Sequence, residues 1–184
     1  GIVPTSATAP ALIMVGFLLA HMYGNAGADI INALLDTDRF SGPDIGAYIN
    51  GGDGSDTITG TRADDAINGG AGGAVIEALG GNDLIYTGNG GASVQAGAGN
   101  DTYRFGRGSG QDTIFDYDTT AGNVDTIQLI GLNQADVTLK RDGKDFVISV
   151  NGSSDVLRVG DWSLGTAARI ERVHRDGRAH HHHQ

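Results

Sequence analysis

A nine-residue period runs through residues 24–104 and limits the fold more than any other feature of the chain. Nine consecutive nonapeptides share it, and the clearest reads GGDGSDTIT, from Gly51 to Thr59. The eighth position is apolar in all nine repeats, although only 39% of the chain is hydrophobic, and the sixth is Asp in six of them. A Gly-rich turn, an acidic position and an apolar position at fixed spacing predict a solenoid whose coils stack on one another.

Each repeat is expected to bend at its glycines and to end in a short strand. Glycine tolerates positive φ and lets two backbones approach closely, so the first four positions can form a tight turn. The last three residues alternate out, in, out, which points the eighth side chain inward. Burial of that side chain stabilises the fold by roughly 1.5–3 kcal/mol. Ordering the backbone of the nine residues costs roughly 1–2 kcal/mol of conformational entropy for each residue. The core is therefore thin, and the coils need a further source of stability.

The sixth-position Asp residues indicate that this source is a metal ion. If two nonapeptides form one coil, Asp residues one coil apart stack at about 4.8 Å. Their carboxylates then repel each other by roughly 3–4 kcal/mol at an effective dielectric constant of about 20. A divalent cation between the two carboxylates attracts both and turns the net interaction favourable. Ligands that are all oxygen, turn carbonyls included, favour calcium over zinc or copper. The alternative is a metal-free solenoid in which Asp serves as a turn former.

Two repeats are complete, and two more have lost glycines: GGDGSDTIT at 51–59 and AGAGNDTYR at 96–104, then ALGGNDLIY at 78–86 and GNAGADIIN at 24–32. They resemble the RTX, or hemolysin-type calcium-binding, nonapeptide of proteins secreted by Gram-negative bacteria. Residues 124–177, after the exit-like stretch FGRGSGQDTIFDYD, are similar to the hemolysin-type segment that caps such arrays. The resemblance implies an all-β fold: a right-handed, calcium-binding parallel β-roll with a β-rich C-terminal cap. It also implies export by a type I secretion apparatus.

The resulting division of the chain has four parts: an N-terminal segment at 1–23, the roll at 24–116, the cap at 117–179 and a tail resembling a purification tag at 180–184. For the apolar N-terminal segment, the preferred prediction is a short capping helix that starts at Pro10 and stops at Gly24. The alternative extends the repeat backward, with Ile13 and Met22 inward and Ala20 at the Asp position. The apolar run at 11–20 is too short to span a bilayer, and we expect no transmembrane segment.

Six strands are expected after the last repeat, near 112–116, 124–130, 136–140, 144–150, 155–160 and 168–174. The turn signals Asp142-Gly143 and Asn151-Gly152 join three of them, at 136–140, 144–150 and 155–160, into two consecutive hairpins. These residues would form the β-rich cap.

The candidate calcium ligands fall on two edges of the roll. One edge would carry Asp29, Ala47, Asp65, Asp83 and Asp101, and the other Asp38, Asp56, Ala74 and Ala92. With the turn glycines, the predicted ligand set is Asp83, Asp101, Gly81, Gly97, Gly99, Asp65, Gly60, Asp56, Gly52, Gly54, Asp38 and Asp29. The Asp83/Asp101 pair has the best turn chemistry, because a glycine precedes Asn-Asp in both turns. Alanine at 74 and 92 offers no side-chain ligand.

Amino-acid composition and charge reduce the number of function classes that the chain could serve. A net charge of −10 and a pI near 4.7 argue against nucleic acid or an anionic membrane as a partner. Cysteine is absent, and no catalytic constellation is recognisable, so we expect no catalytic residues. The preferred prediction is a monomeric calcium-binding module that folds after type I secretion and serves a larger extracellular protein. The alternative is an accessory domain of a secreted lipase, metalloprotease or alginate epimerase that binds substrate or polysaccharide.

Overall fold

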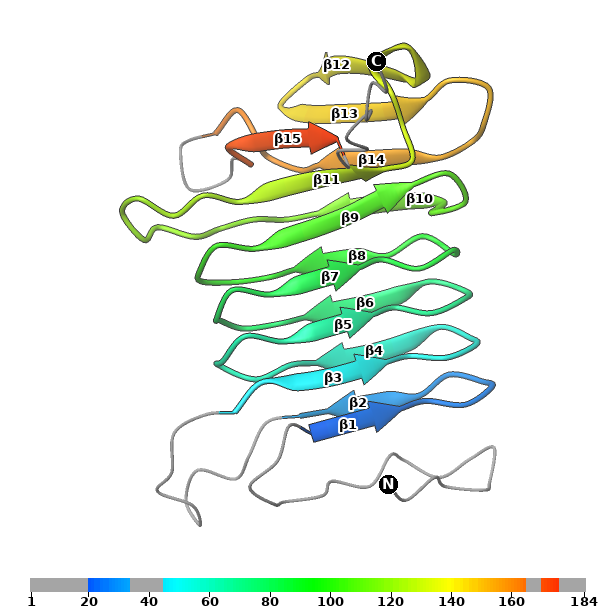
Figure 1. Cartoon of the computed structure of the whole chain (residues 1–184), viewed down its shortest axis with the longest axis vertical. Helices are drawn as coiled ribbons and strands as arrows, with labels where there is room; N and C mark the ends of the chain where they lie inside the picture. Colours follow the sequence, from blue (N-terminus) through cyan, green and yellow to red (C-terminus); the bar gives the residue numbers. More distant parts are fainter. Residues whose placement is uncertain (1–19, 34–44, 165–169, 176–184) are drawn as a thin grey trace, which may run out of the picture.

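The chain forms two parallel β-sheets that face each other across a thin apolar core (Figure 1). The computed structural model describes residues 20–33, 45–164 and 170–175. Sheet 1 contains, in spatial order, β1 (Ala20–Tyr23), β3 (Ala47–Asn50), β5 (Ala66–Asn68), β7 (Leu84–Tyr86), β9 (Thr102–Gly106), β11 (Thr126–Ile130) and β15 (Arg172–Arg175). Sheet 2 contains β2 (Ile30–Asn32), β4 (Asp56–Thr59), β6 (Ala74–Glu77), β8 (Ser93–Gln95), β10 (Gln111–Ile114), β14 (Val156–Val159), β13 (Asp145–Val150) and β12 (Val137–Asp142). A single turn of 3₁₀-helix, η1 (Gln134–Asp136), precedes β12.

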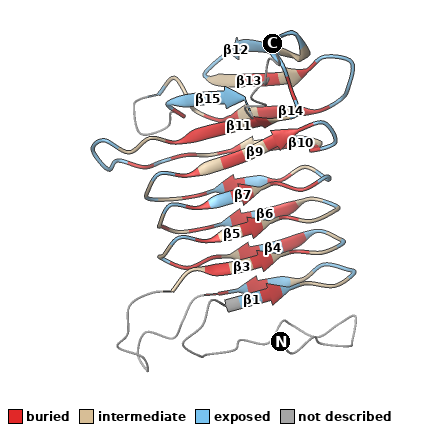
Figure 2. Ribbon diagram, in the orientation of Figure 1, coloured by how far each residue is buried: buried red, intermediate tan, exposed pale blue. Residues whose placement is uncertain are grey.

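Consecutive strands alternate between the sheets, so two nonapeptides make one coil. In sheet 1, Ile49 pairs with Ile67 and Ile67 with Ile85, which places identical repeat positions one above the other. The eighth-position side chains are buried between the sheets, as predicted; they are Ile31, Ile49, Ile58, Ile67, Ile76, Ile85, Val94 and Tyr103. Buried positions recur in the strands of both sheets (Figure 2). The ninth, Phe40, lies outside the described residues. The solenoid predicted from the period and the all-β parallel roll implied by the resemblance are confirmed.

The first coil does not follow the spacing of the others. Ala20 pairs with Ala47 and Ile30 with Thr57, so each strand of this coil is displaced from its partner by 27 residues rather than 18. The connection between β2 and β3 therefore contains one extra nonapeptide. Because one nonapeptide is half a coil, Asp29 lies on the edge of Asp56, and our assignment of Asp29 to the other edge is wrong.

The N-terminal prediction also needs correction. Residues 20–23 form strand β1, not the end of a helix that stops at Gly24. Met22 is buried and pairs with Ile49, and Ala20 pairs with Ala47 at the Asp position. The alternative frame is therefore right for these residues. Pro10 and Ile13, on which the rest of both predictions depends, lie outside the described residues.

Both sheets continue from the repeats into the C-terminal residues. Strand β11 adds to β9, and β14 to β10, in parallel; β13 and β12 then extend sheet 2 as antiparallel strands. The six strands expected after the last repeat are confirmed within a few residues. Gly143 and Gly152 have φ of 63° and 79°, as the predicted turns require.

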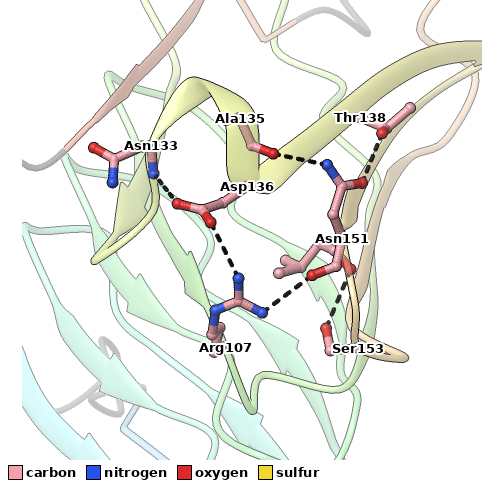
Figure 3. Close-up of polar contacts among 8 residues, drawn as sticks. Arg107, Asn133, Ala135, Asp136, Thr138, Asn151 and Ser153 are labelled. Carbon is pink, nitrogen blue, oxygen red and sulfur yellow. Dashed lines mark hydrogen bonds and ion pairs between the residues drawn. The ribbon is translucent and has the colours of Figure 1, made fainter.

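One polar cluster attaches the β12–β14 region to the roll (Figure 3). Arg107, in the turn between β9 and β10, donates hydrogen bonds to Asp136 Oδ1 and to the Asn151 carbonyl, both at 3.2 Å. The Asn151 amide in turn donates to the Ala135 carbonyl and accepts from the Thr138 hydroxyl. Because the Arg107–Asp136 ion pair is largely exposed, we expect it to contribute little to stability.

Candidate metal centre

A column of acidic side chains follows one edge of the roll, where the chain passes from sheet 2 back to sheet 1. We call it the acidic ladder; its members are Asp65, Asp83, Asp101, Asp125 and Glu171. Each member accepts a hydrogen bond from the backbone N–H of the residue one coil below. The donors and distances are Ala47 to Asp65 (2.6 Å), Asp65 to Asp83 (2.8 Å), Asp83 to Asp101 (2.8 Å), Asp101 to Asp125 (2.8 Å) and Asp125 to Glu171 (2.9 Å).

The two central members of the ladder have a carboxylate oxygen without a partner. Asp83 and Asp101 are each 1% exposed, and the Oδ2 atom of each is buried with no hydrogen-bond donor in the described structure. A buried anionic oxygen without a partner is strongly destabilising unless a proton or a cation neutralises it. At these two positions the ladder holds its coils together through Oδ1 and leaves Oδ2 available to a ligand.

Burial raises the pKa values of these carboxyl groups. Desolvation, followed by the charges of Asp101 and Asp65, raises the pKa of Asp83 to about 8 against a usual value of 3.8. Desolvation, together with Asp125 and Asp118, raises the pKa of Asp101 to about 7. Without a cation, the folded roll therefore favours protonated carboxyl groups at this edge. A divalent cation would stabilise the charged forms instead.

A second column of side chains, at the fifth repeat position, links the same turns on the exposed surface of the roll; it contains Asp64, Asn82 and Asn100. The backbone N–H of Asn82 donates to Asp64 Oδ1 at 2.6 Å, and that of Asn100 donates to Asn82 Oδ1 at 2.9 Å. The backbone N–H of Val124 donates to Asn100 Oδ1 at 2.7 Å. These bonds run in the opposite direction to those of the acidic ladder. Together the two columns fix the spacing of successive turns.

Backbone contact between turns explains the glycines of this edge. A Cβ atom on Gly99, whose φ is +132°, would lie 1.8 Å from the Gly81 carbonyl oxygen. Gly81 and Gly97 also have positive φ. Leu79 takes the equivalent place of Gly97 one coil below and is held at φ +85°, which L-residues rarely adopt. The turns are thus close enough for carbonyl groups of one coil to lie beside carboxylates of the next.

The turn at 60–65, GTRADD, differs from its neighbours because it keeps only its first glycine. The Thr61 backbone N–H donates to Asp65 Oδ2 at 2.7 Å, and its hydroxyl donates to Asp65 Oδ1 at 2.9 Å. Both oxygens of Asp65 are therefore occupied, unlike those of Asp83 and Asp101. Gly60 begins this turn, where a Cβ atom would lie 2.4 Å from Asp65 Oδ2.

The opposite edge has an interrupted column. Asp56 Oδ1 accepts from the backbone N–H of Asp29 at 2.9 Å, while its buried Oδ2 has no donor among the described residues. The turn between β3 and β4 contains Gly52 and Gly54, both with positive φ. Ala74 and Ala92 follow Asp56 in the column and supply no carboxylate. Asp38 lies outside the described residues.

Three acidic residues, two of the ladder and one of the interrupted column, were missed in the sequence because they break the 18-residue spacing. Asp125 follows Asp101 by 24 residues, and Glu171 follows Asp125 by 46. Asp112 continues the interrupted column, where it accepts from the Ala92 N–H at 2.8 Å and the Thr87 hydroxyl at 2.7 Å. A signal was present for two of them: the tripeptide Asp-Thr-Ile recurs at 56, 112 and 125.

Stacked turns with buried, partly unpaired carboxylates define a metal-binding β-solenoid. The family profile of the RTX calcium-binding nonapeptide repeat matches the chain in four copies, at residues 21–42, 48–76, 70–103 and 79–112. No curated protein with which the chain was compared is significantly similar to it. The chain belongs to the RTX calcium-binding repeat family, whose repeats are structural modules of proteins typically exported by type I secretion.

RTX nonapeptide repeats bind calcium, and the donor set at the ladder fits this ion. The available groups are hard oxygen atoms: carboxylates with a free Oδ2 and turn carbonyls. Within the described ranges, no three acidic, histidine or cysteine side chains converge into a metal site. A site formed by two carboxylates from neighbouring coils and backbone oxygens is consistent with both observations. No helix among the described residues has the length and apolar character needed to cross a membrane.

Proposed function

We propose that this chain is a calcium-driven folding module of a larger protein exported by a type I apparatus. The observation that carries the proposal is the set of buried, unpartnered Oδ2 atoms of Asp83 and Asp101. In a compartment with little calcium these carboxylates oppose folding, because each would have to be protonated or buried without a partner. In calcium-rich extracellular medium the ion stabilises the same groups, so the chain folds after export.

Within this function, we assign the strongest sites to the acidic ladder. The Asp83/Asp101 site would use both carboxylates, with carbonyls from the turns of Gly81, Gly97 and Gly99. Asp65/Asp83, with the turn of Gly60, is weaker because Thr61 already donates to both Asp65 oxygens. The carboxylate and carbonyl oxygens of two neighbouring coils would hold the calcium ion, which would supply the positive charge that these carboxylates lack. Asp56, with Gly52 and Gly54, would hold an ion with Asp29 on the other edge.

Circular dichroism tests the proposal. In excess chelator the chain should show little β-structure, and millimolar calcium should fold it cooperatively, since calcium binding stabilises only the folded roll. The affinity of each site is expected in the ~10⁻⁴–10⁻³ M range of extracellular calcium modules. Magnesium is the matched control ion, because its smaller radius and stricter geometry suit these turns poorly. A complete β-spectrum in chelator would reject the proposal.

A second candidate function is supported by the outer face of sheet 1. A shallow hollow of about 400 Å³ lies there, lined by Tyr48, Ala66, Asn68, Leu84, Tyr86 and Arg104 among others. The buried Nε atom of Arg104 has no hydrogen-bond partner in the described structure. The tyrosine rings can stack on sugars, and Arg104, whose Nε–H has no partner, offers a local cationic contact for an acidic polysaccharide although the whole chain carries a net charge of −10. The module would then also anchor its parent protein to such a polymer.

Calorimetry with polygalacturonate, and with a neutral glucan as the control ligand, tests this second function in the calcium-loaded protein. Arg104→Ala should abolish binding of the acidic polymer. Arg62→Ala, which removes an exposed arginine from a turn outside the hollow, should leave it unchanged. Equal binding of both polymers, or equal effects of both substitutions, would exclude this function without affecting the proposed role of calcium.

A further inference from the structure

Asp116 is an acidic residue in a place where the roll elsewhere uses alanine. Ile114 pairs with Val94, and Ile76 with Val94, so continuing these registers places Asp116 beside Ala96 and Ala96 beside Ala78. Both alanines are completely buried. Asp116 is itself only 1% exposed, and neither of its carboxylate oxygens has a hydrogen-bond donor in the described structure. An acid in a column of small apolar residues indicates a ligand.

The surroundings of Asp116 are acidic. Its carboxyl group lies against that of Asp125, with Asp101 and Glu171 nearby, and desolvation together with these charges raises the pKa of Asp116. Asp125 accepts hydrogen bonds from the Asp101 N–H at 2.8 Å and from the Asn123 amide at 2.7 Å. Two carboxyl groups in such close contact must share either a proton or a cation.

We propose that Asp116 and Asp125 form a further calcium site, at the junction between the repeats and the C-terminal strands. This inference rests on the calcium binding proposed above but uses a residue outside the nonapeptide pattern. Asp116 follows β10 of the roll, whereas Asp125 precedes β11 and accepts from Asp101 of the last repeat. Asp125 also donates its N–H to Glu171, which precedes β15. An ion at this point joins the last coil, the 115–125 connection and the terminal strand.

The junction site gives the C-terminal strands a direct part in calcium-dependent folding. Without Asp125 and Glu171, the ladder would end at Asp101 and β9 would be an uncovered edge strand. With the ion in place, closing the end of the roll and binding calcium become one event. The Arg107 contacts on the other side of the same region, being exposed, cannot provide comparable coupling.

Calcium stoichiometry in two variants of the full chain tests this site. Asp116→Asn removes the charge and keeps the shape, and Asp116→Ala restores the residue found at 78 and 96, so a folded protein is expected. Both variants should bind one calcium ion fewer than the unmodified chain by equilibrium dialysis, and both should need several-fold more calcium to fold.

Asp118→Asn is the matched control. Asp118 lies in the same connection, but its carboxylate already accepts from the N–H groups of Gly99 and Thr120 and from the Asn123 amide. This variant should lose stability yet bind the full number of ions at saturating calcium. Unchanged stoichiometry in both Asp116 variants would overturn the junction site. If they also fold at lower calcium, the Asp116–Asp125 pair shares a proton instead. If the unmodified chain itself neither binds calcium nor responds to it, the failure lies with the proposed function.

Discussion

Asp83→Asn should have opposite effects on the metal-free and the calcium-loaded protein. Asparagine keeps the Oδ1 acceptor for the Asp65 N–H but removes the charge. With a folded-state pKa of about 8, Asp83 must be protonated on folding at pH 7, which costs about 4 kcal/mol relative to an unfolded chain with the usual value. The variant avoids this cost, so it should be the more stable protein in chelator.

In calcium the order reverses. Asp83 lies between Asp65 and Asp101 and is shared by two proposed sites, and each ion at a hundred times its Kd contributes about 2.7 kcal/mol. Losing two ions removes about 5 kcal/mol. The net result is a variant about 1 kcal/mol less stable than the unmodified chain at high calcium. The calcium-induced gain in unfolding free energy therefore falls by about 5 kcal/mol.

Circular dichroism across a calcium titration at pH 7 measures both effects: the β-content in chelator reports the metal-free stability, and urea unfolding reports the stability once calcium has folded the chain. The stability curves of the variant and the unmodified chain should cross as calcium rises. Asp29→Asn is the comparison variant, because Asp29 is only partly buried and Asp56 is its one acidic neighbour in the column among the described residues. Its calcium-induced gain in unfolding free energy should fall by no more than the contribution of one ion, about 2.7 kcal/mol and half the loss expected for Asp83→Asn. Parallel curves for Asp83→Asn, or equal losses in the two variants, would refute the assignment of the ladder as the main calcium site.

Three further outcomes follow from the same contacts. In chelator, the stability of the fold should increase as the pH falls, because folding raises the pKa of Asp83 to about 8 and that of Asp101 to about 7. The stabilisation from their protons is complete below about pH 4 and is lost as the pH rises through 7–8. Greater β-content at pH 9 than at pH 5 would contradict this. Leu79→Gly should raise the unfolding free energy in calcium by about 0.5–1 kcal/mol, because relief of the positive φ outweighs the conformational entropy of glycine. Gly97→Ala should lower it, because the new Cβ atom would lie 2.2 Å from the Leu79 carbonyl oxygen; the reverse order of the two variants in urea unfolding would disprove this reading of the turns. A fragment of residues 1–116 should not fold in calcium, because it lacks Asp125 and leaves β9 uncovered; dichroism equal to that of the whole chain would show that the C-terminal strands are dispensable.

The repeating unit can be derived from the amino-acid sequence alone. The inward eighth position, the turns at the glycines and the 18-residue coil all follow from local chemistry: an apolar side chain needs a core, and a tight turn needs residues that tolerate positive φ. Residues such as Ile58 and Gly54 therefore lie where the period placed them. The weakness of the turn at 60–65 was also readable, because a turn without glycine must satisfy its backbone through a side chain such as Thr61.

Which acidic residues share a column follows from the pairing of strands in the folded protein and cannot be read from the sequence. Sequence spacing predicts stacking only while each coil has the same length, and that condition fails at both ends of the repeats. The extra nonapeptide before β3 moves Asp29 to the edge of Asp56, and the longer connections after β10 and β14 bring Asp125 and Glu171 onto the ladder. Strand pairing in space, with one N–H of each coil bound to a carboxylate of the next, sets the membership of the ladder; the number of residues between two acids along the chain does not.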